Sequence, residues 1–78
     1  MPVYWFHWDS ENDAHIEEHG LTREEVEEVI SEPEFTGVSR SSGRPIAEGY
    51  TSSGRYILCV YDVLQDGEIY PVTAFEID

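Results

Sequence analysis

The feature that most constrains this 78-residue chain is the stretch Tyr56–Val63, which is apolar on both of its alternating sides. Leu58 and Val60 lie on one side, Ile57 and Cys59 lie on the other, and only Asp62 is charged. A strand of this kind belongs in the middle of a sheet with cover on each face. Because the chain is also too short for two domains, we expect a single domain over residues 1–78 that is built around this strand.

Further strands are predicted on both sides of this segment. Short clusters of Ser, Gly, Asp and Gln separate apolar runs in the second half of the chain, which is typical of strands joined by tight turns. Pro71 cannot donate a ladder hydrogen bond, so the last strand is expected at an edge or to be irregular there. The predicted strands cover residues 3–8, 35–40, 44–51, 55–64 and 68–77.

Two helices are predicted between the first strand and the others. Asp9 or Ser10 can cap the first helix, and Gly20 is placed to end it in a left-handed turn. Thr22 and Glu25 form a capping box for the second helix, whose apolar stripe then follows. The sequence thus predicts an α+β fold: β-α-α followed by a four-stranded antiparallel meander, with both helices packed on one sheet face. The stripe consists of Val26, Val29 and Ile30.

Charge restricts the partners of this chain. It has 17 acidic side chains and four basic ones, a net charge of −13, and all four basic residues are Arg. Eleven of the acids lie in residues 1–34. Affinity for nucleic acid comes largely from cations at phosphates, so DNA binding is not expected and RNA binding is disfavoured. A basic protein partner fits this surface better.

Cysteine content and the length of the apolar runs indicate the cellular compartment of the protein. The single Cys59 cannot form an internal disulfide, which favours a reducing compartment, and we expect a cytoplasmic protein. No apolar run approaches the roughly 18 residues that span a bilayer, so no membrane association is expected. P-loop, dinucleotide-binding, Ser-His-Asp and paired Cys-x-x-Cys patterns are missing, so the sequence predicts no cofactor.

The first half of the chain resembles the N-terminal signature of BrnT-type toxins, which belong to the RelE-like group of bacterial type II toxin–antitoxin systems. The similarity begins with Trp8-Asp9-x-x-Asn12-x-x-His15-Ile16-x-x-His19-Gly20-Leu21-Thr22 and extends to Val29. Shorter matches are Gly49-Tyr50-Thr51, Gly54-Arg55-Tyr56-Ile57-Leu58 and Pro71-Val72-Thr73-Ala74. The resemblance implies a RelE-like fold and a small ribonuclease that cuts translated RNA and is held inactive by a cognate antitoxin.

The chain departs from this family near its C-terminus. Phe75 stands where the family typically has Arg, and the basic helix that usually follows is missing before the sequence ends at Asp78. Together with the charge of −13, these differences predict that RNA cleavage is weakened or lost. The alternative function is a non-catalytic module that binds a basic protein.

The resemblance and the chemistry of RNA cleavage together select the candidate site residues. Cleavage without a metal requires proton transfer and stabilisation of charge on the phosphoryl oxygens. Arg55, which matches the family's Gly-Arg, and Arg44 are the candidates for phosphate contact, His19 is a candidate for proton transfer, and Thr73 for a bond to phosphate. The alternative for Arg55 is a salt bridge to a carboxylate such as Asp62 or Glu48.

His15 and His19 are also weak candidates for binding zinc or nickel. Their spacing of four places both on one helix face, but two ligands do not complete a metal site. We expect instead that His19 closes the helix at its C-terminus and that His15 is a half-buried packing residue.

Overall fold

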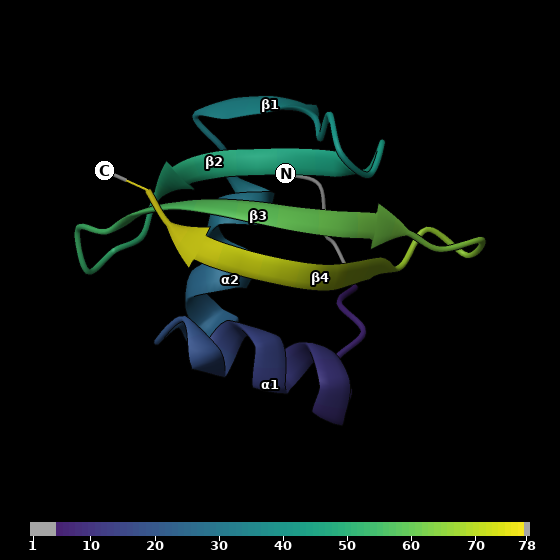
Figure 1. The fold of residues 1–78 in the computed structure, drawn as a ribbon, viewed down its shortest axis with the longest axis horizontal. Helices are drawn as coiled ribbons and strands as arrows, with labels where there is room; N and C mark the ends of the chain where they lie inside the picture. The colour runs from purple at the N-terminus through teal and green to yellow at the C-terminus, as the bar shows by residue number, and fades with distance from the viewer. Residues whose placement is uncertain (1–4, 78) are drawn as a thin grey trace.

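The computed structural model describes residues 5–77, and its fold is α+β (Figure 1). Two helices precede four strands that form one antiparallel sheet in the order β1-β2-β3-β4. The meander predicted from the sequence is therefore confirmed, with strand ends within two residues of the expected ones. The elements are α1 (Ser10–Glu18), α2 (Arg23–Ser31), β1 (Phe35–Val38), β2 (Pro45–Tyr50), β3 (Tyr56–Val63) and β4 (Ile69–Glu76).

The strand expected at residues 3–8 is not present in the part that the structure describes, and residues 3 and 4 lie outside it. Phe6 forms a single parallel bridge with Ile69, supported by hydrogen bonds from His7 N to Ile69 O (2.8 Å) and from Ile69 N to Trp5 O (2.7 Å). The pairing ends there because the chain turns into α1 at Asp9. The N-terminal segment thus anchors the start of β4 without extending the sheet.

Helix α1 begins at an Asp9 cap, one of the two residues expected. The Asp9 carboxylate accepts hydrogen bonds from the backbone N–H groups of Asn12 and Glu11, both at 3.0 Å, and from the Tyr70 hydroxyl at 3.0 Å. The backbone N–H of Asn12 is the largest cause that lowers the pKa of Asp9 below its ordinary value of 3.8. Gly20 follows the His19 C-cap with a φ of 72°, the left-handed conformation that the sequence predicted for this position.

Helix α2 begins with the predicted capping box. Thr22 Oγ1 accepts from the N–H of Glu25 (3.2 Å), and Glu25 Oε1 accepts from the N–H of Thr22 (3.1 Å). The apolar stripe of Val26, Val29 and Ile30 is buried against the sheet, as expected. Both helices share one core with the inward-facing strand residues, because Ile16 of α1 also lies in this cluster. The strand members of the cluster are Ala47, Ile57, Cys59, Ile69 and Ala74.

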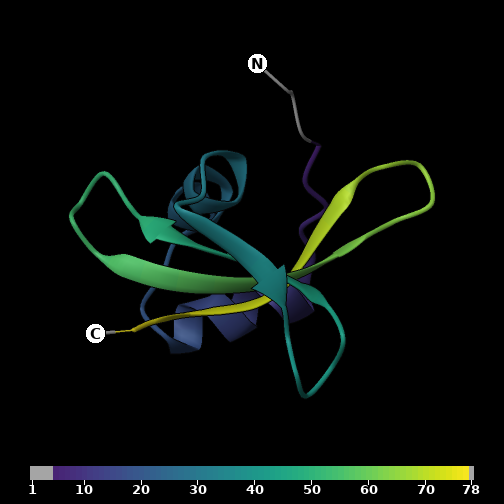
Figure 2. The same ribbon diagram turned by 90° about the horizontal axis from the view of Figure 1, so that it is seen from above.

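Strand β3 lies between β2 and β4, as predicted, but the helices of residues 5–77 cover only one of its sides. Ile57 and Cys59 are fully buried, and burial raises the pKa of the Cys59 thiol to about 12. Leu58 and Val60, on the opposite side, are only half-buried. The prediction of cover on each face is thus wrong. Figure 2 shows α2 on one side of the sheet and the loop between β1 and β2 projecting to the other.

Strand β4 is irregular at the position that Pro71 predicted. The register with β3 shifts between Val60, which pairs with Thr73, and Tyr61, which pairs with Pro71. The buried Asn12 side chain of α1 bonds to this point: its Nδ2 donates to Pro71 O at 2.9 Å. The Asn12 side-chain amide therefore ties α1 to the irregular part of β4.

Candidate functional site

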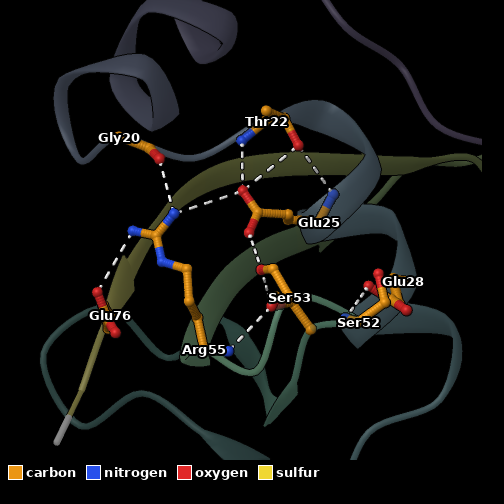
Figure 3. Close-up of polar contacts among 9 residues, drawn as sticks. Gly20, Thr22, Glu25, Glu28, Ser52, Ser53, Arg55 and Glu76 are labelled. Carbon is orange, nitrogen blue, oxygen red and sulfur yellow. Dashed lines mark hydrogen bonds and ion pairs between the residues drawn. The ribbon is translucent and has the colours of Figure 1, made fainter.

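The Arg55 guanidinium, expected to contact phosphate, lies inside a polar network that connects the helices to the sheet (Figure 3). Its Nη1 donates to the backbone carbonyl of Gly20 at 2.9 Å and lies 3.6 Å from Glu25 Oε1. Its Nη2 lies 3.3 Å from Glu76 Oε1. The ion-pair alternative is thus confirmed, although with other carboxylates than expected, because Asp62 is bound by Arg44 and Glu48 accepts from Tyr56.

The polar groups around Arg55 form hydrogen bonds and ion pairs with one another. Glu25, whose side chain is 15% exposed, also accepts from the Ser53 hydroxyl at 3.0 Å. The backbone N–H of Arg55 donates to Thr51 Oγ1 (3.1 Å), and the Ser52 N–H donates to Glu28 (2.8 Å). The network therefore joins the turn after α1, the start of α2 and the turn before β3. A phosphate at Arg55 would therefore compete with these carboxylates and with the Gly20 carbonyl for the guanidinium.

We predict that Arg55→Met lowers the free energy of unfolding by about 2 kcal/mol, because it breaks one hydrogen bond and two ion pairs, one of them to the little-exposed Glu25. Urea unfolding followed by tryptophan fluorescence measures this loss. Arg44→Met is the matched control, since it removes the same charge from an exposed pair with Asp62, and it is expected to cost less than about 1 kcal/mol. Equal losses for the two variants would contradict a structural role for Arg55.

His15 of α1 and His19, the residue that caps the end of α1, both contact β4. His15 Nδ1 is 3.2 Å from Val72 O, and His15 is exposed, so the prediction of a half-buried residue is wrong. The reason is that this helix face meets the edge of β4. His19 is the C-cap residue, as expected, and its ring packs at 6.0 Å on Phe75. Within the described residues, no group of three His, Cys, Asp or Glu side chains could hold a metal ion.

The side of the sheet without helices carries a hollow of about 580 Å³. Two of the predicted site residues, Arg44 and Thr73, line it, whereas Arg55 and His19 do not. Its apolar lining consists of Val38, Ile46, Leu58, Val60, Val72 and Phe75. Its polar lining consists of Ser39, Arg40, Ser41, Ser42, Arg44 and Thr73.

The lining of the hollow limits its chemistry. Among the described residues that form it there is no His, Asp or Glu, so no side chain is placed there to exchange protons near neutral pH. Arg44 Nε bonds both carboxylate oxygens of Asp62 at 3.1 Å. Arg40 is the one arginine that has no carboxylate partner within residues 5–77, and the sequence pattern alone gave no reason to prefer it. The arrangement can bind an anion, but it does not assemble an acid–base pair.

Comparisons with protein-family models, with curated proteins and with solved structures found no match to this chain. None of the helices in residues 5–77 is long and apolar enough to cross a membrane.

Proposed function

We propose that this chain is a RelE-like, BrnT-type toxin domain that has lost RNA cleavage and acts by binding a basic protein, such as a cognate antitoxin. Support for the fold assignment comes from the order of two helices and a four-stranded meander, joined to residues that carry the sequence signature. The observation that carries the loss of cleavage is the position of Arg55, whose guanidinium is bound to Gly20, Glu25 and Glu76.

Support for a basic partner comes from the outer surface of α1. Ala14, Glu17 and Glu18 line a shallow depression there. Both carboxylates are exposed, and none of the four arginines pairs with them within the described residues. Unpaired carboxylates on one helix face attract a cationic surface and accelerate its association. They equally repel the phosphates of RNA.

The loss of cleavage is tested by expressing the protein alone in bacteria and by incubating the purified chain with messenger RNA. We expect normal growth, intact RNA and no binding of a labelled oligoribonucleotide at micromolar protein. Growth arrest with RNA cleavage would overturn this part of the proposal.

The basic partner is tested with a labelled arginine-rich peptide, whose binding should weaken steeply as salt rises. Glu17→Gln/Glu18→Gln should lower the affinity by about fivefold to tenfold at low salt. Glu32→Gln/Asp66→Asn removes the same charge away from this surface and should change the affinity little. Equal effects of the two double variants, or binding that is independent of salt, would contradict the proposal.

A further inference from the structure

We propose that the hollow on the helix-free side of the sheet binds a small amphiphilic carboxylate, with its apolar body on the sheet and its anionic head at Arg40 and Arg44. This site lies on a different surface from the α1 carboxylates, so it is independent of the proposed basic partner. The volume of about 580 Å³ is within the range of small-molecule sites, roughly 300–1,000 Å³.

The floor of the hollow is apolar because the strands alternate. Ile46 of β2 pairs with Val60 of β3, and Leu58 pairs with Phe75 of β4, so these four side chains lie on one side of the sheet. All four are only half-buried, since no described helix crosses them. Thr73 supplies the one hydroxyl among the strand residues of the lining. This floor favours a hydrocarbon or aromatic body over a ligand that needs many hydrogen bonds, such as a nucleobase.

The head group is selected by charge. Two of the four arginines of this strongly acidic chain line the hollow, and no described carboxylate lines it. Arg40 has no carboxylate partner within residues 5–77, and Arg44 binds Asp62 through Nε, so its terminal nitrogens donate to none of the described carboxylates. Guanidinium groups bind carboxylates through paired hydrogen bonds. Elsewhere on the molecule, Arg23 and Arg55 are held by acids.

The shape of the loop between β1 and β2 places these cations beside the floor. Figure 2 shows this loop extending away from the sheet on the side opposite to α2. Arg40 lies in the loop and Arg44 lies at its end, directly before β2. The loop therefore forms a wall with a cationic rim above the outward side chains of the sheet. An anion with a short apolar tail complements both parts.

The experiment compares octanoate, octylammonium and octanol, which share one apolar body and differ in charge. Titrations of the full chain are followed by calorimetry and by the backbone amide shifts in its ¹H–¹⁵N spectrum. We expect octanoate to bind at least about tenfold tighter than octylammonium, although the net charge of −13 favours the cation. The largest shifts are expected at residues 39–44 and at the outward positions of β3 and β4. Tighter binding of octylammonium, or shifts confined to the helices, would overturn the proposal.

Variants distinguish the contribution of the carboxylate head to the binding affinity from that of the apolar tail. Arg40→Gln should weaken octanoate about tenfold and leave octanol unchanged, whereas Val60→Ser should weaken both. Arg23→Gln, which removes the same charge from the exposed pair with Asp13, is the control and should leave octanoate binding unchanged. An unchanged affinity in Arg40→Gln contradicts the site. If an oligoribonucleotide displaces octanoate from these residues, the occupant of the hollow is RNA and the carboxylate proposal is wrong. If these residues are buried when the protein self-associates, the occupant is a second copy of the chain.

Discussion

Ile57→Ala should lower the free energy of unfolding by about 3–4 kcal/mol, whereas Leu58→Ala, one residue further along β3, should lower it by about 1 kcal/mol. Ile57 is completely buried beneath the helices, so its truncation leaves a cavity in the shared core. Leu58 is half-buried on the helix-free side, where water replaces the methyl groups that are removed. Because the two side chains have the same size, the difference between the two losses of unfolding free energy shows whether the sheet is covered on one side or on both.

Urea unfolding followed by tryptophan fluorescence and by far-UV circular dichroism gives both values. The dependence of the unfolding free energy on urea should stay constant, because neither change alters the surface that unfolding exposes. Losses of equal size would mean that a second layer covers Leu58, as the sequence pattern alone suggested. Addition of octanoate then provides a second contrast, since it should raise the melting temperature of Ile57→Ala but much less that of Leu58→Ala.

Asn12→Asp should destabilise the fold by about 3 kcal/mol at pH 7, although the two side chains have nearly the same shape. Asn12 is 1% exposed, and its Nδ2 donates to His7 O at 3.0 Å and to Pro71 O at 2.9 Å. Its Oδ1 accepts from the N–H of Asp9 at 2.8 Å, and an aspartate keeps this bond. An ionised aspartate would, however, lose both donated hydrogen bonds, and its charged oxygen would face the carbonyl oxygens of His7 and Pro71 in a buried position.

The pH dependence of this variant identifies the cause. Burial raises the folded-state pKa of the introduced aspartate above its unfolded value of about 3.9, so the folded state prefers the neutral acid. The penalty is therefore complete at pH 7 and shrinks as the pH falls through the folded-state pKa toward about 4. Asn12→Ala is the control, because its deficit relative to the original protein should not depend on pH. A deficit of Asn12→Asp that stays constant from pH 7 to pH 4 would contradict the donor role of Asn12.

Local chemistry explains why most elements were predictable. The Asp9 cap, the capping box of Thr22 and Glu25, and the left-handed Gly20 act through neighbours a few residues away, so the sequence contains both partners. The strands of the meander were predictable from their apolar and β-branched residues, and the turns from the Ser, Gly and Asp clusters between them. Pro71 predicted that the last strand lies at an edge or is irregular, because a residue without an N–H cannot donate a ladder hydrogen bond, and β4 shows both features.

The errors concern features that need contacts from distant parts of the chain. The composition of residues 3–8 predicted a strand, but the cap at Asp9 ends the pairing of the described part after a single bridge at Phe6. Alternating apolar residues in β3 could not reveal that no described helix lies above Leu58 and Val60, because a covered face and an open apolar face have the same sequence pattern. Larger exposed apolar patches mark interaction sites, and for this reason we place the proposed carboxylate ligand on this face.

By itself the sequence determined the two capped helices, the four paired strands and an acidic exterior, because each depends on local hydrogen bonds, alternation or composition. Only the tertiary structure decided that Arg55 is bound by Gly20, Glu25 and Glu76 while Arg40 and Arg44 stand beside an apolar hollow. The four arginines are chemically equivalent in the sequence. Their roles differ because the fold brings carboxylates from distant elements to some of them and leaves Arg40 without one in the described chain.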